Sequence, residues 1–305
     1  MIDIAHRLSS LYKAVAVSGI TVGHSATISA IRNRDVSSED VLAFAKAAGL
    51  LAAKRTHEFI PGTAMAPVEF ADMRFDLGEK EIRIEAEMHT VYKSGVEMQA
   101  MLAVSVAALT LFDMIRLLDD DVSILPSQLV KVKGGVRDYM EEGYEKLRAL
   151  VVVCSDTISA GKKEDKAGKV IVESLQQCGL TDIQYTIIPD EASQIQGKAK
   201  LAESEGVDLI IFTGGTGLSP RDVSPDVIAP LLDREIPGVM EAARSYGQQR
   251  TPYAMLSRGV AGMMGKSLVL TLPGSTKGAK ESMEALFPAL LHIFAVRIGA
   301  RHDKK

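Results

Sequence analysis

Apolar residues recur at helical spacing in two segments of the first half of the chain. The first segment is expected to begin at a capping residue, Ser37, with Asp40 three residues on, and to end near His57. The second covers residues 96–118 and is apolar on nearly all sides. Such a helix is expected to be buried against several neighbours, including a partner subunit.

Polar and apolar residues alternate elsewhere in this half. Residues 68–77 and 82–88 place apolar and charged side chains at every second position, and a polar alternating stretch opens the chain. A period of two is typical of strands in a half-exposed antiparallel sheet. The first half is therefore predicted to be an α+β domain with its helices on one face of the sheet.

The second half has a different pattern, in which short apolar runs alternate with helical segments. The runs occupy residues 148–154, 183–188, 209–212 and 268–272. Strands that alternate with helices predict an α/β domain, in which a mostly parallel sheet carries helices on both faces.

A short charged segment at residues 138–147 separates these two patterned halves, which share no internal repeat. The chain has 305 residues, of which 47% are hydrophobic, so each half is long enough to bury its own core. We expect one domain at residues 1–137, a linker at 138–147 and a second domain at 148–305.

Charge and composition exclude several classes of partner. A net charge of −4, with 5% aromatic residues and no Trp, provides neither a basic field nor a stacking platform for nucleic acid. Cys154 and Cys178 are read as core thiols of a reducing compartment. The first residues lack the order of a secretory signal, and the longest apolar segment contains Asp113 and Arg116. We therefore expect a cytoplasmic protein without a membrane partner.

Residues typical of binding sites follow each expected strand of the second half. They are Ser155, Asp156 and Thr157; Pro189, Asp190 and Glu191; Thr213 to Gly217; and Pro273, Gly274 and Ser275. Because the carboxyl ends of parallel strands meet at one edge, this order should gather Asp156, Asp190, Asp222 and Lys277 around the glycines. Glycine lets backbone amides approach phosphate oxygens, and carboxylates can hold the magnesium of a nucleotide.

Other interpretations of neighbouring residues stay open. Asp222 and Asp226 could instead cap a helix that begins near Pro225. Arg258, next to Ser257, is either an anion partner or part of a structural salt bridge.

The charged loop at residues 161–168 has two interpretations as well. Its Asp165 and Gly168 either touch a ligand or form a solvated turn. His292 is read as a packed or capping residue. A phosphate-loop NTPase is excluded because Gly214-Gly-Thr-Gly217 lacks the Gly-Lys-Ser/Thr ending of that motif.

The second half carries six specific motifs. They are Ser155-Asp-Thr157, Ile188-Pro-Asp-Glu191, Thr213-Gly-Gly-Thr-Gly217, Ser219-Pro-Arg-Asp-Val-Ser-Pro-Asp226, Leu256-Ser-Arg-Gly259 and Leu272-Pro-Gly-Ser-Thr-Lys-Gly278. Through them, roughly residues 148–300 resemble the molybdopterin adenylyltransferase family (MogA/MoaB-like). The resemblance implies a trimeric α/β fold that binds the dithiolene pterin and, in catalytic members, transfers AMP from ATP to its terminal phosphate with magnesium.

This resemblance also implies a role for particular residues. Asp190 and Asp222 match the family's catalytic carboxylates, which would fix Mg²⁺ and align the pterin phosphate with the α-phosphorus of ATP. The implied residues for binding molybdopterin and ATP are Ser155, Asp156, Thr213, Gly214, Gly215, Thr216, Gly217, Ser257, Gly274, Ser275 and Lys277.

A second set of motifs marks the first half. It comprises Ala48-Gly49, Ala52-Ala-Lys-Arg-Thr56, Ile60-Pro61, Ser94-Gly-Val-Glu-Met98, Ala103-Val-Ser-Val-Ala-Ala-Leu-Thr110 and Phe112-Asp-Met114. Through these, residues 1 to about 137 resemble the cyclic pyranopterin monophosphate synthase family (MoaC-type). The resemblance implies a ferredoxin-like α+β fold, a hexameric assembly, and rearrangement of a GTP-derived intermediate into the cyclic pterin phosphate.

Several positions depart from that synthase pattern. The family's Leu-Cys-His-Pro-Leu is replaced by residues 62–66, which contain no imidazole for proton transfer. Gln99 replaces a glutamate, Arg116 replaces a lysine, and the Lys-Ser-Gly-Gly-Lys ending is altered at residues 132–136. Arginine holds its proton at any working pH, so it is a poor acid or base.

The remnant synthase site is therefore expected to consist of Lys54, Glu97, Asp113 and Arg116. On one continuous helix, Glu97 and Asp113 would lie roughly 24 Å apart along the axis, so a shared site would have to cross a dimer interface. The alternative is that Lys54, Arg55 and Asp113 serve only interface ion pairs.

The sequence thus predicts a fused molybdenum cofactor biosynthesis protein. Its second half would bind molybdopterin and activate it with ATP and Mg²⁺, while its degenerate first half would serve assembly. A threefold homo-oligomer, either a trimer or a hexamer, follows from the symmetry of the two families. The alternatives are a truly bifunctional protein with an active synthase half, and a pterin-binding scaffold without catalysis.

Overall fold

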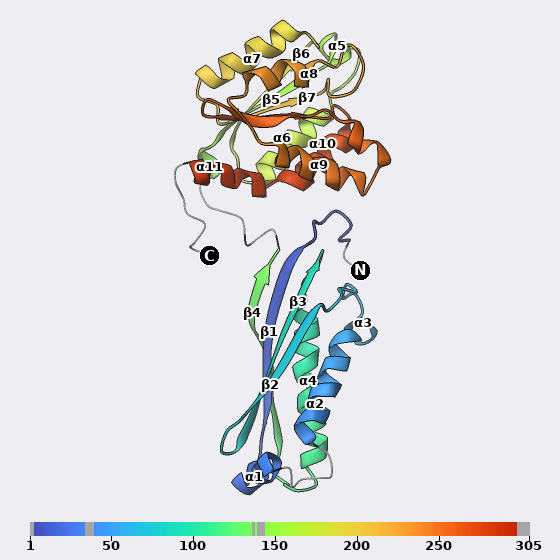
Figure 1. The fold of residues 1–305 in the computed structure, drawn as a ribbon, viewed down its shortest axis with the longest axis vertical. Helices are drawn as coiled ribbons and strands as arrows, with labels where there is room; N and C mark the ends of the chain where they lie inside the picture. Colours follow the sequence, from blue (N-terminus) through green and yellow to red (C-terminus); the bar gives the residue numbers. More distant parts are fainter. Residues whose placement is uncertain (1–2, 34–39, 136–137, 139–143, 298–305) are drawn as a thin grey trace. The chain divides into compact units, whose positions relative to one another are not determined.

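The computed structural model describes residues 3–33, 40–135, 138 and 144–297. The chain divides into two compact units, Met1–Asp138 and Tyr139–Lys305, each built around its own sheet (Figure 1).

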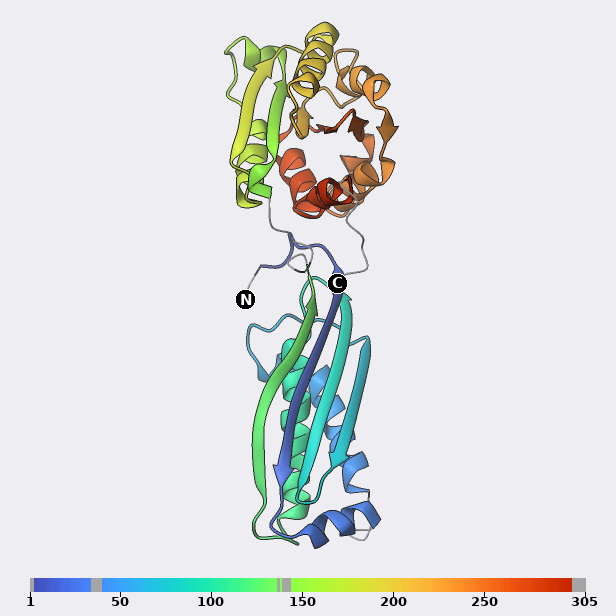
Figure 2. The same cartoon turned by 90° about the vertical axis from the view of Figure 1, so that its left-hand side faces the viewer.

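The N-terminal unit is a four-stranded sheet with order β2-β3-β1-β4, in which all neighbours are antiparallel. Its strands are β1 (Ser10–Thr21), β2 (Phe70–Leu77), β3 (Glu81–Tyr92) and β4 (Ser123–Gly134), and its helices are α1 (Ser25–Asn33), α2 (Val41–Lys54), α3 (Thr56–Phe59) and α4 (Glu97–Ile115). The long helices α2 and α4 cover one face of the sheet (Figure 2). The predicted placement of helices on a single face is confirmed.

Helix α2 begins later in the chain than the sequence suggested. The carboxylate of Asp40 accepts hydrogen bonds from the backbone N–H groups of Leu42 and Ala43, each at 3.1 Å. Asp40 is therefore the N-cap, and the expectation of Ser37 was wrong; Ser37 itself lies outside the described residues. The helix ends at Lys54, and the expected end near His57 falls in the short helix α3 that follows.

Helix α4 supplies the centre of this unit's core. Part of its apolar surface is buried against α2 and the sheet, namely Ala100, Ala103, Val104, Ala107, Ala108, Leu111 and Ile115. By length and composition α4 could cross a membrane, but 44% of its most apolar window is buried within the fold. Leu109 on the same helix is 56% exposed, so part of the apolar surface is left uncovered.

The C-terminal unit has a six-stranded sheet with order β6-β5-β7-β10-β9-β8. Its strands are β5 (Arg148–Cys154), β6 (Asp182–Ile188), β7 (Leu209–Thr213), β8 (Arg234–Glu235), β9 (Ala261–Met264) and β10 (Ser267–Leu272). Four neighbouring strands, from β6 to β10, are parallel, and β9 and β8 continue the sheet antiparallel. The expectation of a mostly parallel sheet is confirmed.

Helices cover both faces of this sheet. They are α5 (Asp156–Ser159), α6 (Ala167–Gln177), α7 (Ala192–Ser204), α8 (Ser224–Ile228), α9 (Pro237–Gln248), α10 (Thr276–Leu286) and α11 (His292–Arg297), with 3₁₀ turns η2 (Tyr144–Lys146), η3 (Ala229–Leu231), η4 (Pro252–Leu256) and η5 (Ala289–Leu291). Helices α7 and α8 lie on one face, and α6, α9 and α10 on the other (Figure 1). The continuous apolar runs of β5, β7 and β10 are buried because both faces are covered.

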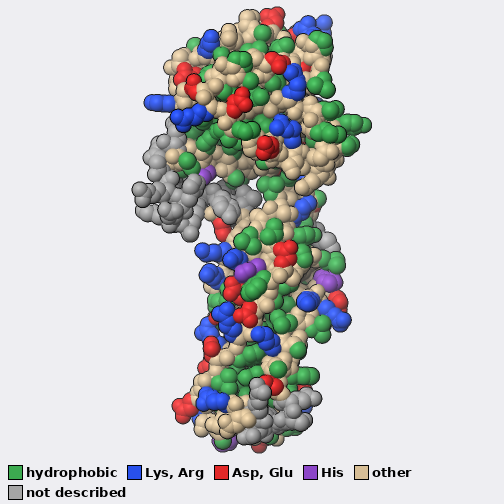
Figure 3. Space-filling view, viewed as in Figure 1, with side chains coloured by type: hydrophobic (Ala, Val, Ile, Leu, Met, Phe, Trp, Pro, Cys, Tyr) green, Lys and Arg blue, Asp and Glu red, His purple; other side chains and the backbone are tan. Residues whose placement is uncertain are grey.

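Acidic and basic side chains are interspersed over the visible surface of both units, without a continuous basic area in this view (Figure 3). That distribution agrees with the small net charge of −4.

Candidate functional site

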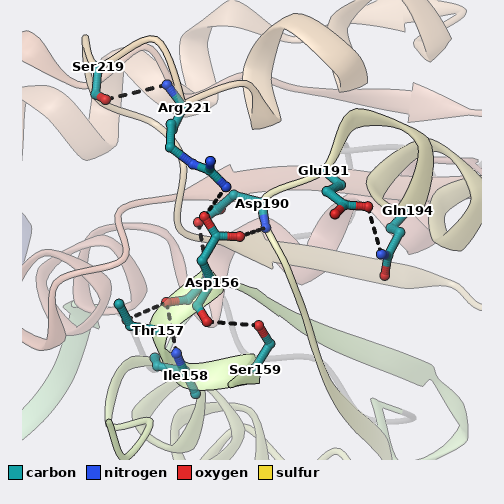
Figure 4. Close-up of polar contacts among 10 residues, drawn as sticks. Asp156, Thr157, Ile158, Ser159, Asp190, Glu191, Gln194, Ser219 and Arg221 are labelled. Carbon is teal, nitrogen blue, oxygen red and sulfur yellow. Dashed lines mark hydrogen bonds and ion pairs between the residues drawn. The ribbon is translucent and has the colours of Figure 1, made fainter. Parts of the chain in front are cut away.

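The carboxyl ends of β5 and β6 are held together by two aspartates. The backbone N–H of Asp156 donates to Oδ2 of Asp190 at 3.3 Å, and the backbone N–H of Asp190 donates to Oδ1 of Asp156 at 3.1 Å (Figure 4). Each carboxylate therefore accepts from the loop that carries the other. This exchange fixes two acidic side chains at the same edge of the sheet, as the strand order predicted.

Arg221 joins this pair from a different loop. Its guanidinium donates to the carboxylate of Asp156, and its own backbone N–H donates to Oγ of Ser219 at 3.3 Å (Figure 4). The side chain of Arg221 is still 67% exposed. A cation thus lies beside the acidic pair and is accessible to a negatively charged ligand.

Asp190 is a partly buried carboxylate at the centre of the site. Its Oδ1 atom is buried and has no hydrogen-bond partner among the described residues. Burial raises the pKa of Asp190, the carboxylates of Asp156 and Asp222 raise it further, and the Asp156 amide and Arg221 partly oppose them. A buried acceptor oxygen that lacks a donor is a position for a cation or a donor from a ligand.

A glycine turn follows β7 directly beside Asp190. Gly214 and Gly215 have φ values of 111° and 62°, a region that favours glycine. A Cβ on Gly214 would lie 2.2 Å from the carbonyl oxygen of Cys154, and one on Gly215 would lie 3.4 Å from Oδ1 of Asp190. A Cβ on Gly215 would also lie 2.6 Å from Oγ of Ser224, so both positions need to lack a side chain for the turn to pack against the end of β5 and the start of α8.

The loop after this turn positions Asp222. The Asp222 carboxylate accepts from the backbone N–H of Ser219 at 2.9 Å, and the Asp222 N–H returns a bond to the Ser219 carbonyl at 2.9 Å. Asp222 does not cap helix α8, because the N-cap there is Val223 and no side chain caps that helix. The open alternative of helix capping is thus wrong for both Asp222 and Asp226.

Arg258 braces this loop from the opposite side. Its guanidinium donates to the Gly217 carbonyl at 2.8 Å, to the Asp222 carbonyl, and to both carboxylate oxygens of Asp226 at 2.9 Å. Its backbone N–H donates to the Thr216 carbonyl at 3.0 Å. Of the two interpretations of Arg258, the structure supports the structural salt bridge.

The end of β10 completes the edge. Oγ1 of Thr213 donates to the Pro273 carbonyl at 2.8 Å, and a Cβ on Gly274 would lie 2.9 Å from Cα of Gly214. Ser275 is the N-cap of α10, where its Oγ accepts from the Gly278 N–H at 3.1 Å. The two turns after β7 and β10 therefore touch.

Three other predicted residues line a pocket of about 270 Å³ on the side of α9 and α10. They are Ser257, Ser275 and Lys277, and the pocket's further lining includes Tyr253 and Glu281. Glu281 was not predicted from the sequence. Its position four residues after Lys277 suggests an ordinary ion pair on a helix surface. Only the folded structure shows that Glu281 is buried.

Asp165 and Gly168 do not belong to the site. Oδ1 and Oδ2 of Asp165 accept from the N–H groups of Gly168 and Lys169, each at 3.1 Å, and Tyr185 donates to Oδ2 at 2.8 Å. Asp165 is 3% exposed. The residue holds the start of α6, so both earlier interpretations, ligand contact and a solvated turn, are replaced by a buried structural role.

The predicted remnant synthase residues lie in separate places. Lys54 lines a pocket of about 200 Å³ together with His57, Ala64 and Gln99, whereas Glu97 begins α4. Asp113 is near the other end of α4 and is paired with Arg116 at 3.0 Å.

Because α4 is one continuous helix from Glu97 to Ile115, the prediction that Glu97 and Asp113 are far apart within a chain is confirmed. Two of the residues considered for interface ion pairs have partners within the chain: Asp113 pairs with Arg116, and Arg55 pairs with Glu58.

Comparisons with known proteins divide the chain in the same way. A family model described as the MoaC family matches residues 1–135, and one described as a probable molybdopterin binding domain matches residues 150–292. Over 302 residues the chain is 39% identical to the molybdenum cofactor biosynthesis bifunctional protein of Chlorobaculum tepidum, covering 99% of this chain and 96% of that protein.

Two further relatives match the C-terminal unit alone. The molybdopterin adenylyltransferase of Helicobacter pylori is 36% identical over 152 residues, which cover 49% of this chain and 86% of that protein. The solved structure of the molybdopterin biosynthesis enzyme MoaB from Thermus thermophilus is 43% identical, with a TM-score of 0.48, and covers 50% of this chain and 98% of that one.

Proposed function

This chain belongs to the family of bifunctional molybdenum cofactor biosynthesis proteins, and from that premise we propose that its C-terminal unit transfers AMP from ATP to the terminal phosphate of molybdopterin. The relative named molybdopterin adenylyltransferase supports this activity. The observation that carries the proposal is the buried, unpartnered Oδ1 of Asp190, which faces a glycine turn and lies near a second carboxylate, Asp222.

The donor set fits magnesium. Mg²⁺ is usually held by one or two carboxylates together with substrate phosphates, and Asp190 and Asp222 provide two such groups. Within the described residues, no group of three or more His, Cys, Asp or Glu is arranged so that it could hold a metal ion by itself, so substrate phosphates would have to complete the coordination. When bound, Mg²⁺ would neutralise charge on the phosphate oxygens of ATP.

The chain's own residues position the reacting groups. The backbone N–H groups of residues 215–217 would bind phosphate oxygens, whereas the Gly214 N–H already donates to the Leu272 carbonyl, and Arg221 would add a cation beside them. A terminal phosphate oxygen of molybdopterin would form a bond to the α-phosphorus of ATP. The bond from that phosphorus to the bridging oxygen would break, and pyrophosphate would leave.

The experiment that tests this function uses the full chain with purified molybdopterin, ATP and Mg²⁺. We expect adenylylated molybdopterin and pyrophosphate to form in equal amounts, and chelation of Mg²⁺ to stop both. Binding of molybdopterin without pyrophosphate release would instead identify a pterin carrier.

We propose that the N-terminal unit is a ferredoxin-like domain that has lost synthase activity. The β-α-β-β-α-β order and the strand order β2-β3-β1-β4 support the fold class. Loss of activity is supported by Ala64, which lines the pocket with Lys54 where the family's motif would supply histidine, and by the separation of Asp113 from that pocket.

This proposal predicts that the full chain yields no cyclic pyranopterin monophosphate from the GTP-derived intermediate. The reason is that Ala64 lacks the imidazole that the family's motif supplies at this position. The measurement is chromatographic detection of the product, with a MoaC-type enzyme as positive control. Product formation at a rate comparable to the control would show a truly bifunctional protein.

We further propose a cytoplasmic homo-oligomer with threefold symmetry, a trimer or a hexamer, with domains at residues 1–137 and 148–305. Exposed apolar side chains on α2 and α4 support an assembly, since Phe44, Leu51 and Leu109 are each more than half exposed. A molar mass of one chain by light scattering would contradict it.

A further inference from the structure

The first residue of helix α8, Ser224, is fully buried, and its hydroxyl serves no contact within the fold. The side chain is 0% exposed, and its Oγ atom has no hydrogen-bond partner among the described residues. Ser224 does not cap α8, because the N-cap of that helix is Val223 and no side chain caps it. A buried hydroxyl loses its hydration and is expected to gain a hydrogen bond in return. Ser224 therefore has a donor to spare.

A second buried oxygen without a partner in the described part of the chain, Oδ1 of Asp190, lies beside the same turn. A Cβ on Gly215 would lie 2.6 Å from Oγ of Ser224 and 3.4 Å from Oδ1 of Asp190. Both oxygen atoms therefore border the space next to Gly215, although one belongs to the start of α8 and the other to the loop after β6. An unused donor and an unused acceptor are neighbours there.

Gly215 keeps this space open. Its φ of 62° favours glycine, and a side chain at this position would occupy the space that the two oxygen atoms border. The backbone N–H of Ser224 donates to the Gly215 carbonyl at 3.2 Å, which holds the start of α8 against the turn. The position of the Ser224 hydroxyl is thus set by the same turn that approaches Asp190.

The lining of this space suits a water molecule better than a metal ion. Mg²⁺ requires near-ideal octahedral coordination, whereas Ser224 and Asp190 offer only one oxygen atom each. A buried water typically makes roughly two to four hydrogen bonds to buried polar groups that lack other partners. The buried thiol of Cys154 is a neighbour of both residues and adds a weak third partner.

We propose that Ser224 is a positioning residue for Asp190 and holds its carboxylate through one enclosed water molecule. The Ser224 hydroxyl donates to the water, and the water donates to Oδ1 of Asp190. This assignment rests on the proposed AMP transfer, in which Asp190 would hold Mg²⁺. A carboxylate oxygen has two lone pairs, so the water occupies one and leaves the other for the metal.

The link fixes the orientation of the Asp190 carboxylate. Oδ2 already accepts from the Asp156 N–H at 3.3 Å, and the water restrains Oδ1, so both oxygen atoms are held before a metal binds. Removing a group that hydrogen-bonds to a metal-binding side chain typically lowers metal affinity or activity about tenfold to a hundredfold. Ser224 thus acts on the metal site without touching the metal or the substrates.

A crystal structure of the full chain, grown with Mg²⁺ and the non-hydrolysable analogue α,β-methylene-ATP, tests the link directly. We expect one water oxygen at about 2.7–3.0 Å from both Oγ of Ser224 and Oδ1 of Asp190. The absence of a water there would overturn the proposal. A metal ion at about 2.1 Å from Oγ would overturn it as well, because Ser224 would then be a ligand.

The variant Ser224→Ala removes only the hydroxyl oxygen. We expect kcat to fall about tenfold to a hundredfold while KM for molybdopterin stays unchanged. Mn²⁺, used as the probe for Mg²⁺, should bind at least about tenfold more weakly in the presence of α,β-methylene-ATP. Electron paramagnetic resonance measures the free Mn²⁺, so this readout requires no turnover.

The matched control is Ser267→Ala. Ser267 is 1% exposed at the start of β10, and its hydroxyl donates to the Val207 carbonyl at the opposite end of the sheet from the site. Loss of this hydrogen bond should lower Tm and leave the Mn²⁺ affinity unchanged. Equal losses of Mn²⁺ affinity in the two variants would show that Ser224 has only a structural role.

The outcomes separate this inference from the proposed function. If the wild type transfers AMP but Ser224→Ala keeps its kcat and its Mn²⁺ affinity, the role of Ser224 is overturned and the function stands. If the enclosed water is present and Ser224→Ala binds Mn²⁺ more weakly, but the wild type releases no pyrophosphate, the proposed function fails while the role of Ser224 is supported.

Discussion

Asp190→Asn is expected to lower the rate of AMP transfer by about a thousandfold, while the folded protein keeps its stability. The substitution replaces the carboxylate, whose Oδ1 atom is buried and unpartnered among the described residues, by a neutral amide. An amide cannot offset the charge of Mg²⁺. The remaining amide oxygen can still accept from the Asp156 N–H, which donates at 3.3 Å in the wild type. Because burial already raises the pKa of Asp190, removing its charge should cost the fold little.

The measurement is the initial rate of pyrophosphate release at saturating ATP and molybdopterin, with thermal melting as the fold readout. The control is Asp182→Asn, which lies at the opposite end of the same strand, β6, with a side chain 55% exposed. We expect the control to keep full activity and Asp222→Asn to lose it. An Asp190→Asn enzyme with more than about a tenth of the wild-type rate would show that this carboxylate does not hold the metal.

Gly214→Ala is expected to destabilise the C-terminal unit by about 3 kcal/mol or more. Its φ of 111° is strained for any residue with a Cβ, and the added atom would lie 2.2 Å from the Cys154 carbonyl oxygen. Both the backbone conformation and the close approach of two strand ends oppose the substitution. Chemical denaturation followed by far-UV circular dichroism measures the change in the free energy of unfolding.

Gly197→Ala serves as the comparison, since Gly197 is an exposed residue within helix α7 and a Cβ there would meet no atom within 4 Å. Alanine favours helix over glycine, so this variant should gain about 0.5–1 kcal/mol. If both substitutions changed stability by the same amount, the special geometry of the turn after β7 would not be the cause.

The strands that the sequence revealed most clearly are those buried on both faces. Strands β5, β7 and β10 are uninterrupted apolar runs, because every side chain of a central parallel strand meets a helix layer. Strand β4 was not predicted. It lies at the edge of its sheet, most of its side chains are exposed, and it contains Pro126. Its alternation is confined to the four residues from Val130 to Lys133, which is a weak strand signal.

The candidate site was predictable to the extent that it depends on strand order. Asp156 and Asp190 follow adjacent parallel strands, so their proximity follows from topology alone. The role of Arg221 was not predicted, and the sequence left Arg258 open between an anion partner and a structural salt bridge. Each arginine reaches across more than thirty residues of sequence to partners that only the folded loops bring near. Glu281 was missed for a related reason, since helical spacing does not reveal which face of α10 is buried.

The mutual bonding of Asp156 and Asp190 bears on the thermodynamics of ligand capture. The two loops hold each other through hydrogen bonds from their own backbone amides, so they are ordered before a ligand binds. Ligand binding should therefore cost the loops little conformational entropy. Entry of a phosphate should therefore be limited by diffusion and dehydration rather than by loop ordering, and calorimetry should register a small entropic penalty.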